Sequence, residues 1–98
     1  MKDAALEKMI AESNAEVITQ HDGEDITRGE LSRLFDLVKD DRHWKNPIDK
    51  IIGPLSVRDL AMLHYAVSFF AGCELSVANL DDGRLLCTAD GYFLSIGA

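Results

Sequence analysis

Cysteine, proline and basic residues are scarce in this 98-residue chain. It has two cysteines and two prolines, and its 10 lysines and arginines are outnumbered by 17 acids, which gives a net charge of −7. No run approaches the ~18 apolar residues of a membrane-spanning helix, so the sequence predicts no membrane span. The N-terminus lacks the apolar core of a secretory signal, so we expect a cytoplasmic protein whose cysteines are reduced thiols.

Motifs of the common catalytic and ligand sites are also missing. The chain has no phosphate-binding loop, no dinucleotide-binding glycine pattern, no metalloprotease helix and no nucleophile elbow. No stripe of lysine and arginine indicates a nucleic-acid surface, and the negative net charge repels nucleic acid and attracts basic protein surfaces. We therefore expect a non-enzymatic chain without cofactor or metal, whose partner is a protein. The alternative interpretation of the negative net charge is that it only keeps a small protein soluble.

Three segments have the periodicity of amphipathic helices. Residues 4–12 place their apolar side chains on one face, and residues 27–40 begin with a Thr-x-x-Glu capping box. Residues 56–72 begin with a Ser-x-x-Asp box and end at a glycine that is suited to a left-handed cap. This third segment is apolar nearly all round, which predicts a central helix buried on several sides.

Strand signals fall at two places. Residues 16–20 and the Asp22-Gly23 turn signal predict a short strand or the arm of a hairpin. Residues 73–79, 84–89 and 92–96 favour a three-stranded meander.

The first turn of the meander has two alternative lengths. A three-residue turn over 81–83 pairs Leu80 with Arg84 and gathers the apolar residues on one face, with Gly83 at positive φ. A two-residue turn splits them between faces, so we favour the longer turn. The elements together predict an α+β fold in one domain over 1–98, with helices packed on one face of a small antiparallel sheet.

The segment 40–54 concentrates rare residues. Asn46 and Pro47 are typical of a helix start, and Gly53 and Pro54 of a helix end, so we predict a short helix over 47–52. His43 and Trp44 precede it without an assigned structural role.

The three histidines are candidate site residues. His43 has no visible nucleophile or orienting group, and we favour a loop histidine near a helix end. His21 lies among acids whose spacing matches no calcium or zinc motif, which favours a solvated acidic turn. His64 lies on an apolar stripe of the 56–72 segment, and we expect a core histidine that is satisfied by hydrogen bonds.

A second apolar stripe on the 56–72 segment suggests an interface. The stripe consists of Met62, Tyr65, Ala66 and Phe69. The sheet can cover only one side of this helix, so Met62, Tyr65 and Phe69 need another covering surface. Burial under the other helices is the favoured interpretation, and a homodimer or partner interface is the alternative.

Two blocks of sequence resemble a group of small proteins encoded in phage and prophage genomes. They are "ELSRLFDLVKDDRHWKNPID" and "ADGYFLSIGA". No activity or catalytic residue comes with the resemblance, which implies a genomic setting in a bacterial host. Small acidic proteins of phages often bind host proteins, among them CRISPR–Cas and restriction systems.

The expected function is therefore a non-catalytic protein that binds and inhibits a host protein, such as a nucleic-acid-handling defence complex. An acidic face that mimics nucleic acid is one version. The alternatives are a homodimeric assembly module and, with less support, a small enzyme using His43 or His21. The candidate partner-binding residues are His43, Trp44, Asp40, Asp41, Asp36, Asp22, Glu24 and Asp25.

Overall fold

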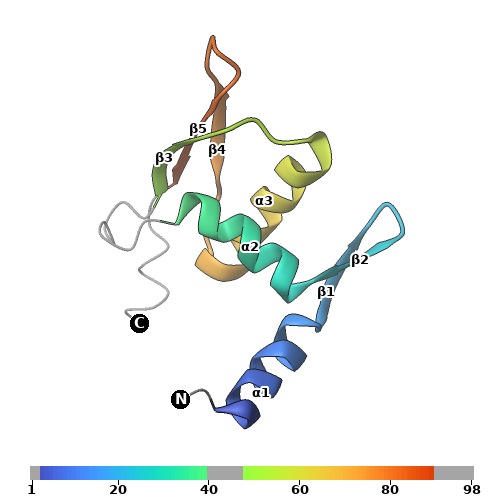
Figure 1. The fold of residues 1–98 in the computed structure, drawn as a ribbon. Coiled ribbons are helices and arrows are strands. Elements are labelled where there is room, and N and C mark those ends of the chain that lie inside the picture. Colours follow the sequence, from blue (N-terminus) through green and yellow to red (C-terminus); the bar gives the residue numbers. More distant parts are fainter. Residues whose placement is uncertain (1–2, 40–47, 90–98) are drawn as a thin grey trace. The chain divides into compact units, whose positions relative to one another are not determined.

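The computed structural model describes residues 3–39 and 48–89 and has an α+β fold (Figure 1). The chain divides into two compact units, the N-terminal unit Met1–Arg33 and the C-terminal unit Leu34–Ala98, and each is described by itself. The helices are α1 (Ala4–Asn14), α2 (Arg28–Val38) and α3 (Val57–Ala71). The strands are β1 (Val17–His21), β2 (Glu24–Thr27), β3 (Ile48–Ile52), β4 (Ser76–Asn79) and β5 (Leu85–Ala89).

The N-terminal unit starts with a capped helix and a hairpin. The Asp3 carboxylate accepts hydrogen bonds from the backbone N–H groups of Ala5 and Leu6, at 2.9 and 3.3 Å, and thereby begins α1. β1 and β2 pair antiparallel, and both residues of their turn have positive φ, 50° at Asp22 and 82° at Gly23. This is the geometry of a two-residue type I′ turn. The predicted hairpin is confirmed.

Polar and close contacts join the end of α1 to the start of α2 inside the N-terminal unit. The backbone N–H of Arg28 donates to the Glu16 carbonyl at 2.9 Å, and the Arg28 guanidinium lies 3.0 Å from the Glu16 carboxylate. A Cβ on Gly29 would lie 3.1 Å from the Cβ of Asn14, so glycine allows the closest approach here. The Thr27 hydroxyl accepts from the Glu30 N–H at 3.2 Å, which confirms the predicted cap of α2.

The cap predictions for α3 are confirmed as well. The Ser56 hydroxyl accepts from the Asp59 N–H at 3.0 Å, and Gly72 ends the helix with φ 68° and an N–H bond to the Ser68 carbonyl. The burial prediction is only partly right. Five α3 residues are buried, but one side of the helix is exposed; the buried residues are Met62, Leu63, Ala66, Val67 and Ala71.

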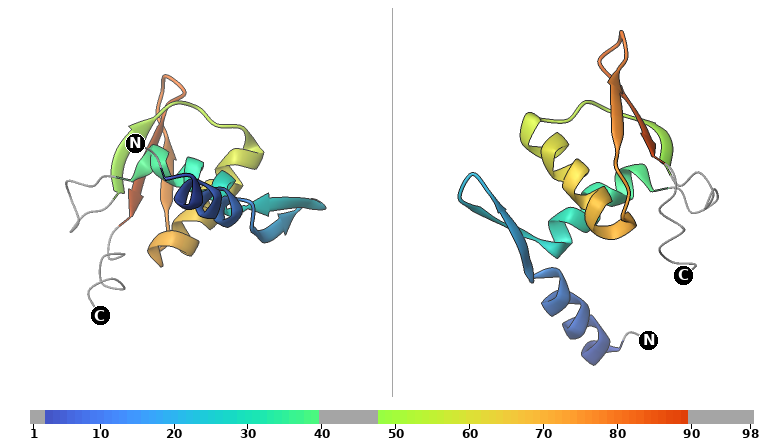
Figure 2. Two further views of the ribbon diagram at one scale, coloured as in Figure 1. Left: turned by 60° about the horizontal axis from the view of Figure 1, so that its bottom comes forward. Right: turned by 180° about the vertical axis from the view of Figure 1, so that it is seen from behind.

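The C-terminal unit contains a three-stranded antiparallel sheet in the order β3-β5-β4. Leu80 and Arg84 close the β4–β5 turn, since the Leu80 N–H donates to the Arg84 carbonyl at 2.9 Å. Gly83 has φ 89°, and Val77 pairs with Cys87. The three-residue turn and its register are therefore confirmed. Figure 2 shows α3 on one face of this sheet. Leu85 and Cys87 of β5 are buried, as is Leu75 just before β4.

The short helix predicted over 47–52 is wrong, because residues 48–52 form the edge strand β3. This strand pairs antiparallel with β5, from Ile48 opposite Ala89 to Ile52 opposite Leu85. A six-residue helix makes few internal hydrogen bonds, whereas β5 offers a full ladder, and isoleucine favours strands. Ile48 and Ile52 lie on the same face and are 2% and 9% exposed. The third strand predicted for the meander, 92–96, lies outside the described residues.

No helix in residues 3–39 and 48–89 has the length and apolar character needed to cross a bilayer.

Candidate functional site: the exposed face of helix α3

The outer side of α3 presents two neighbouring rows of side chains. Tyr65 and Phe69 form one row at i, i+4 spacing and are 38% and 40% exposed. His64 and Ser68 form the adjacent row and are also exposed. We call His64, Tyr65, Ser68 and Phe69 the α3 face. It lies entirely within the C-terminal unit.

Phe69 is exposed but its ring is held in place. The Phe69 ring meets the edge of Phe70 at a centroid distance of 5.0 Å and an interplanar angle of 80°. Phe70 in turn stacks on Phe35 of α2, at 5.4 Å and 29°. Aromatic pairs at these distances attract each other beyond the burial of their surface. Phe69 therefore stands at the outer end of a three-ring cluster that restricts its side chain.

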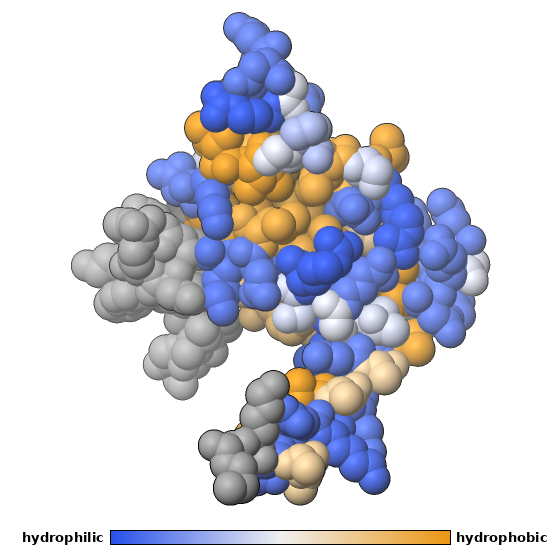
Figure 3. All heavy atoms as spheres, in the orientation of Figure 1, coloured by the Kyte–Doolittle hydropathy of each residue, from blue (hydrophilic) through white to orange (hydrophobic). Residues whose placement is uncertain are grey.

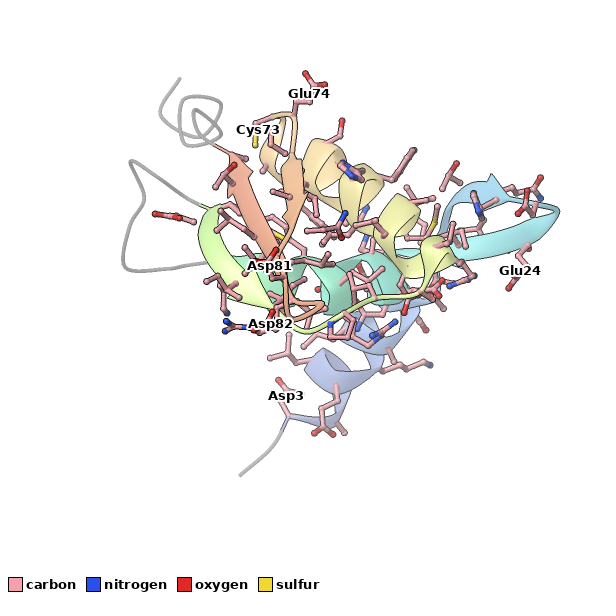
Figure 4. The ribbon with its side chains drawn as sticks, turned by 90° about the horizontal axis from the view of Figure 1, so that it is seen from above. Asp3, Glu24, Cys73, Glu74, Asp81 and Asp82 are labelled. Atoms are coloured by element: carbon pink, nitrogen blue, oxygen red, sulfur yellow. The ribbon has the colours of Figure 1, made fainter. Side chains whose placement is uncertain are left out.

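A hollow of about 490 Å³ adjoins the α3 face. Gly72 adopts a left-handed conformation that turns the chain, and the next residues line the hollow together with the end of α3. The lining residues are His64, Ser68, Gly72, Cys73, Glu74 and Leu75. Leu75 is 5% exposed and supplies an apolar floor, whereas Glu74 points away from the ribbon into solvent (Figure 4).

The chemistry of this region suits recognition of a protein surface. It combines an anchored aromatic ring, a phenol, an imidazole and a hydroxyl beside a hollow with a carboxylate at its rim. Aromatic side chains next to a recess that an anchor residue can fill are typical of the energetic centres of protein interfaces. Polar groups around them supply the hydrogen bonds of an interface rim.

Two predictions for α3 residues need correction. His64 is exposed and not a core histidine. The favoured burial of the second stripe is right for Met62, which is 4% exposed, but wrong for Tyr65 and Phe69, which are 38% and 40% exposed. The buried side of α3 contains Met62 and Ala66 of the second stripe together with Leu63. Ser68 is the missed signal, because this lone hydroxyl lies in the middle of the exposed side.

The acidic candidates belong to different elements of the two units. Asp22, Glu24 and Asp25 lie exposed around the β1–β2 turn, where Glu24 points away from the hairpin (Figure 4). Asp25 accepts from the Gln20 amide at 2.8 Å, and His21 Nε2 lies 3.4 Å from the Asp22 carboxylate. Asp36 is exposed on α2. The other four candidates, Asp40, Asp41, His43 and Trp44, lie outside the described residues.

Metal and thiol chemistry were considered for the described part of the chain. No group of three or more histidine, cysteine or acidic side chains there is arranged to hold a metal ion. Cys73 is partly exposed and Cys87 is buried, and no disulfide joins them. Burial raises the pKa of the Cys87 thiol above its ordinary value, which keeps the sulfur protonated and unreactive.

Comparisons with protein-family models, with curated proteins and with solved structures find no match to this chain. Its function is therefore argued from the arrangement of its own residues.

Proposed function

We propose that this chain is a non-catalytic interaction protein, which binds a protein partner through the α3 face and inhibits it. The observation that carries the proposal is Phe69, a residue that is 40% exposed although its ring packs against the edge of Phe70, which in turn stacks on Phe35. A ring that is ordered before binding loses little conformational entropy on association, so its buried surface converts efficiently into affinity.

The charge of the chain favours a partner with a basic surface. Seventeen acids against 10 bases create a negative field that accelerates encounter with lysine- and arginine-rich proteins. Proteins that handle nucleic acid carry such surfaces. Together with the resemblance to phage-encoded proteins, this supports a host defence complex in the bacterial cytoplasm as the target that we propose.

The proposal is tested by removing the Phe69 ring. Phe69→Ala should weaken capture of the partner from a bacterial lysate by about tenfold or more, as expected for an interface anchor. Val57→Ala is the matched control, because Val57 is 89% exposed and lies at the start of the same helix. The activity of the captured partner should be inhibited by the parent chain and by Val57→Ala, but not by Phe69→Ala. Equal capture by all three chains would refute the proposal.

A homodimeric assembly module is the second candidate, since Tyr65 and Phe69 would serve a second copy equally well. Light scattering at micromolar concentration measures the mass of the chain in solution and thereby distinguishes the inhibitor from the assembly module. A monomer supports binding of another protein, whereas a dimer that Phe69→Ala dissociates supports the assembly module.

A further inference from the structure

The N-terminal unit carries an apolar surface of its own on α1. Leu6, Met9 and Ile10 are 53%, 65% and 53% exposed, and none of the residues of α1 is buried. Their i, i+3, i+4 spacing places them in one stripe along the helix. We call these three side chains the α1 stripe. Figure 3 shows apolar residues interspersed with hydrophilic ones along this helix.

Within its unit, the C-terminal end of α1 is joined to the start of α2. The 3.0 Å ion pair between Glu16 and Arg28 fixes that end, together with the close packing of Asn14 on Gly29. The α1 stripe lies up to two turns further toward the N-terminus. The hairpin and the first turn of α2 therefore leave the stripe uncovered while they hold the helix from which it projects.

An exposed helix of this length needs a covering surface. α1 has 11 residues, and isolated helices shorter than ~12–15 residues are marginal in water. The Asp3 cap contributes about 1 kcal/mol, which assists the helix without replacing tertiary contacts. An amphipathic helix that is capped and joined to a folded hairpin, with its apolar stripe free, is preorganised for docking in a groove.

The charges beside the stripe identify the chemistry of that groove. At about 100° per residue, Glu12 flanks the stripe next to Met9, and Glu7 flanks the other side next to Ile10. Lys8 lies on the opposite side of the helix. Both borders of the stripe are therefore acidic, which complements an apolar groove whose rims carry lysine or arginine.

A second copy of the chain fits this surface less well. Pairing two α1 helices through the stripe brings the flanking glutamates of both copies together, and like charges at close range are destabilising. Three side chains also fall far short of the ~800 Å² that each partner buries in a stable interface. A groove surrounds a helix and contacts more than its stripe, so it buries a larger area of α1 than a second copy of the helix does.

We propose that α1 is a docking helix that inserts the α1 stripe into an apolar, lysine- and arginine-rimmed groove of a partner protein. This surface is separate from the α3 face and does not rest on the function proposed for it.

The test places a photo-crosslinker in the stripe of the full-length chain. Met9→p-benzoylphenylalanine, irradiated in a bacterial lysate, should give an adduct whose crosslinked peptide lies in an apolar groove bordered by lysine and arginine. The matched control is Lys8→p-benzoylphenylalanine, which puts the same probe on the opposite side of α1. Adding Leu6→Ala and Ile10→Ala to the Met9 probe should reduce the adduct by about tenfold, because two anchors are removed.

Charge provides the second readout. Glu7→Gln with Glu12→Gln should lower the adduct yield at low salt and bring it near the level that the parent chain shows at high salt. The proposal is overturned if no adduct forms or if positions 8 and 9 give equal yields. It is also overturned if the adduct joins a second copy or the C-terminal unit, or if the contacted peptide lacks basic residues. Because Phe69 is unchanged in all these variants, the outcome is independent of the α3-face experiment.

Discussion

The two units of this chain use their apolar residues in opposite ways. Of the fourteen apolar side chains buried in the described residues, only Ile26 and Leu31 belong to the N-terminal unit. The other twelve belong to the C-terminal unit, where α3 lies on the β3-β5-β4 sheet. The N-terminal unit instead exposes the α1 stripe and holds its elements together by a cap, a hairpin and an ion pair.

Charge follows the same division. The N-terminal unit has eight acids and four bases in 33 residues, and the C-terminal unit has nine acids and six bases in 65 residues. One unit is thus organised around a core, and the other around local polar contacts that present an acidic, amphipathic surface. This comparison indicates that substituting an apolar residue should cost more stability in the C-terminal unit than along α1 of the N-terminal unit.

The largest expected effect is the loss of stability when a buried side chain of the C-terminal unit is truncated. Leu63 is fully buried, and Leu63→Ala should lower the free energy of unfolding by about 2–5 kcal/mol, since it removes apolar contacts and leaves a cavity. The same change at Leu6, which is 53% exposed, should cost less than about 0.5 kcal/mol.

Urea unfolding followed by circular dichroism measures both losses. Similar losses for Leu63→Ala and Leu6→Ala would remove the distinction between the units.

This division explains which parts of the fold were predictable from sequence. Thr27, Ser56 and Gly72 act through bonds within a few residues, so their patterns predicted the helix ends directly. The β4–β5 register was predictable because one buried face must be coherent, and Gly83 allows the required turn. Local chemistry was sufficient in each case.

The errors arose where distant residues decide the structure. Residues 48–52 have helix-like end signals, but β5 pairs with them across the sheet and makes them a strand. Because the sequence of α3 is apolar on nearly all sides, it does not determine the rotation of the helix about its axis, and therefore does not determine which side is buried. For this reason the sequence predicts a buried His64 and a stripe of Met62, Tyr65 and Phe69 that is buried as a whole. The structure buries Met62 and exposes the other three.

Helix caps give an intermediate effect and compare the units directly. Ser56→Ala removes the bond to the Asp59 N–H and should lower the free energy of global unfolding by about 1 kcal/mol, because α3 carries much of the core. Asp3→Ala removes an equivalent cap from α1, which buries no residue. Its effect should be confined to α1.

Hydrogen exchange separates global from local unfolding. In Asp3→Ala, the amides of α1 should exchange faster while those of α3 keep their protection. Faster exchange in α3 would show that the two helices unfold together and would contradict the comparison.

The smallest expected effect is a change in the free energy of unfolding at alkaline pH, caused by one buried thiol in the C-terminal unit. Burial raises the pKa of Cys87 above its ordinary value of 9.0. The unfolded chain therefore loses this proton at lower pH than the folded chain does, so the stabilisation is complete below about pH 9 and declines as the pH rises. One thiol contributes less than about 1 kcal/mol to this decline between about pH 8 and pH 9.5.

Unfolding in urea across that range measures the slope, and two alanine variants isolate its source. Cys87→Ala should flatten the alkaline decline, whereas Leu6→Ala should keep the slope of the parent chain, because the exposed Leu6 side chain does not titrate. Other groups titrate in the same range, so the informative quantity is the difference between the two variants. An identical slope in both would mean that the Cys87 sulfur is as accessible to water in the folded chain as in the unfolded one. That result would place β5 at the surface and contradict a core centred on the C-terminal sheet.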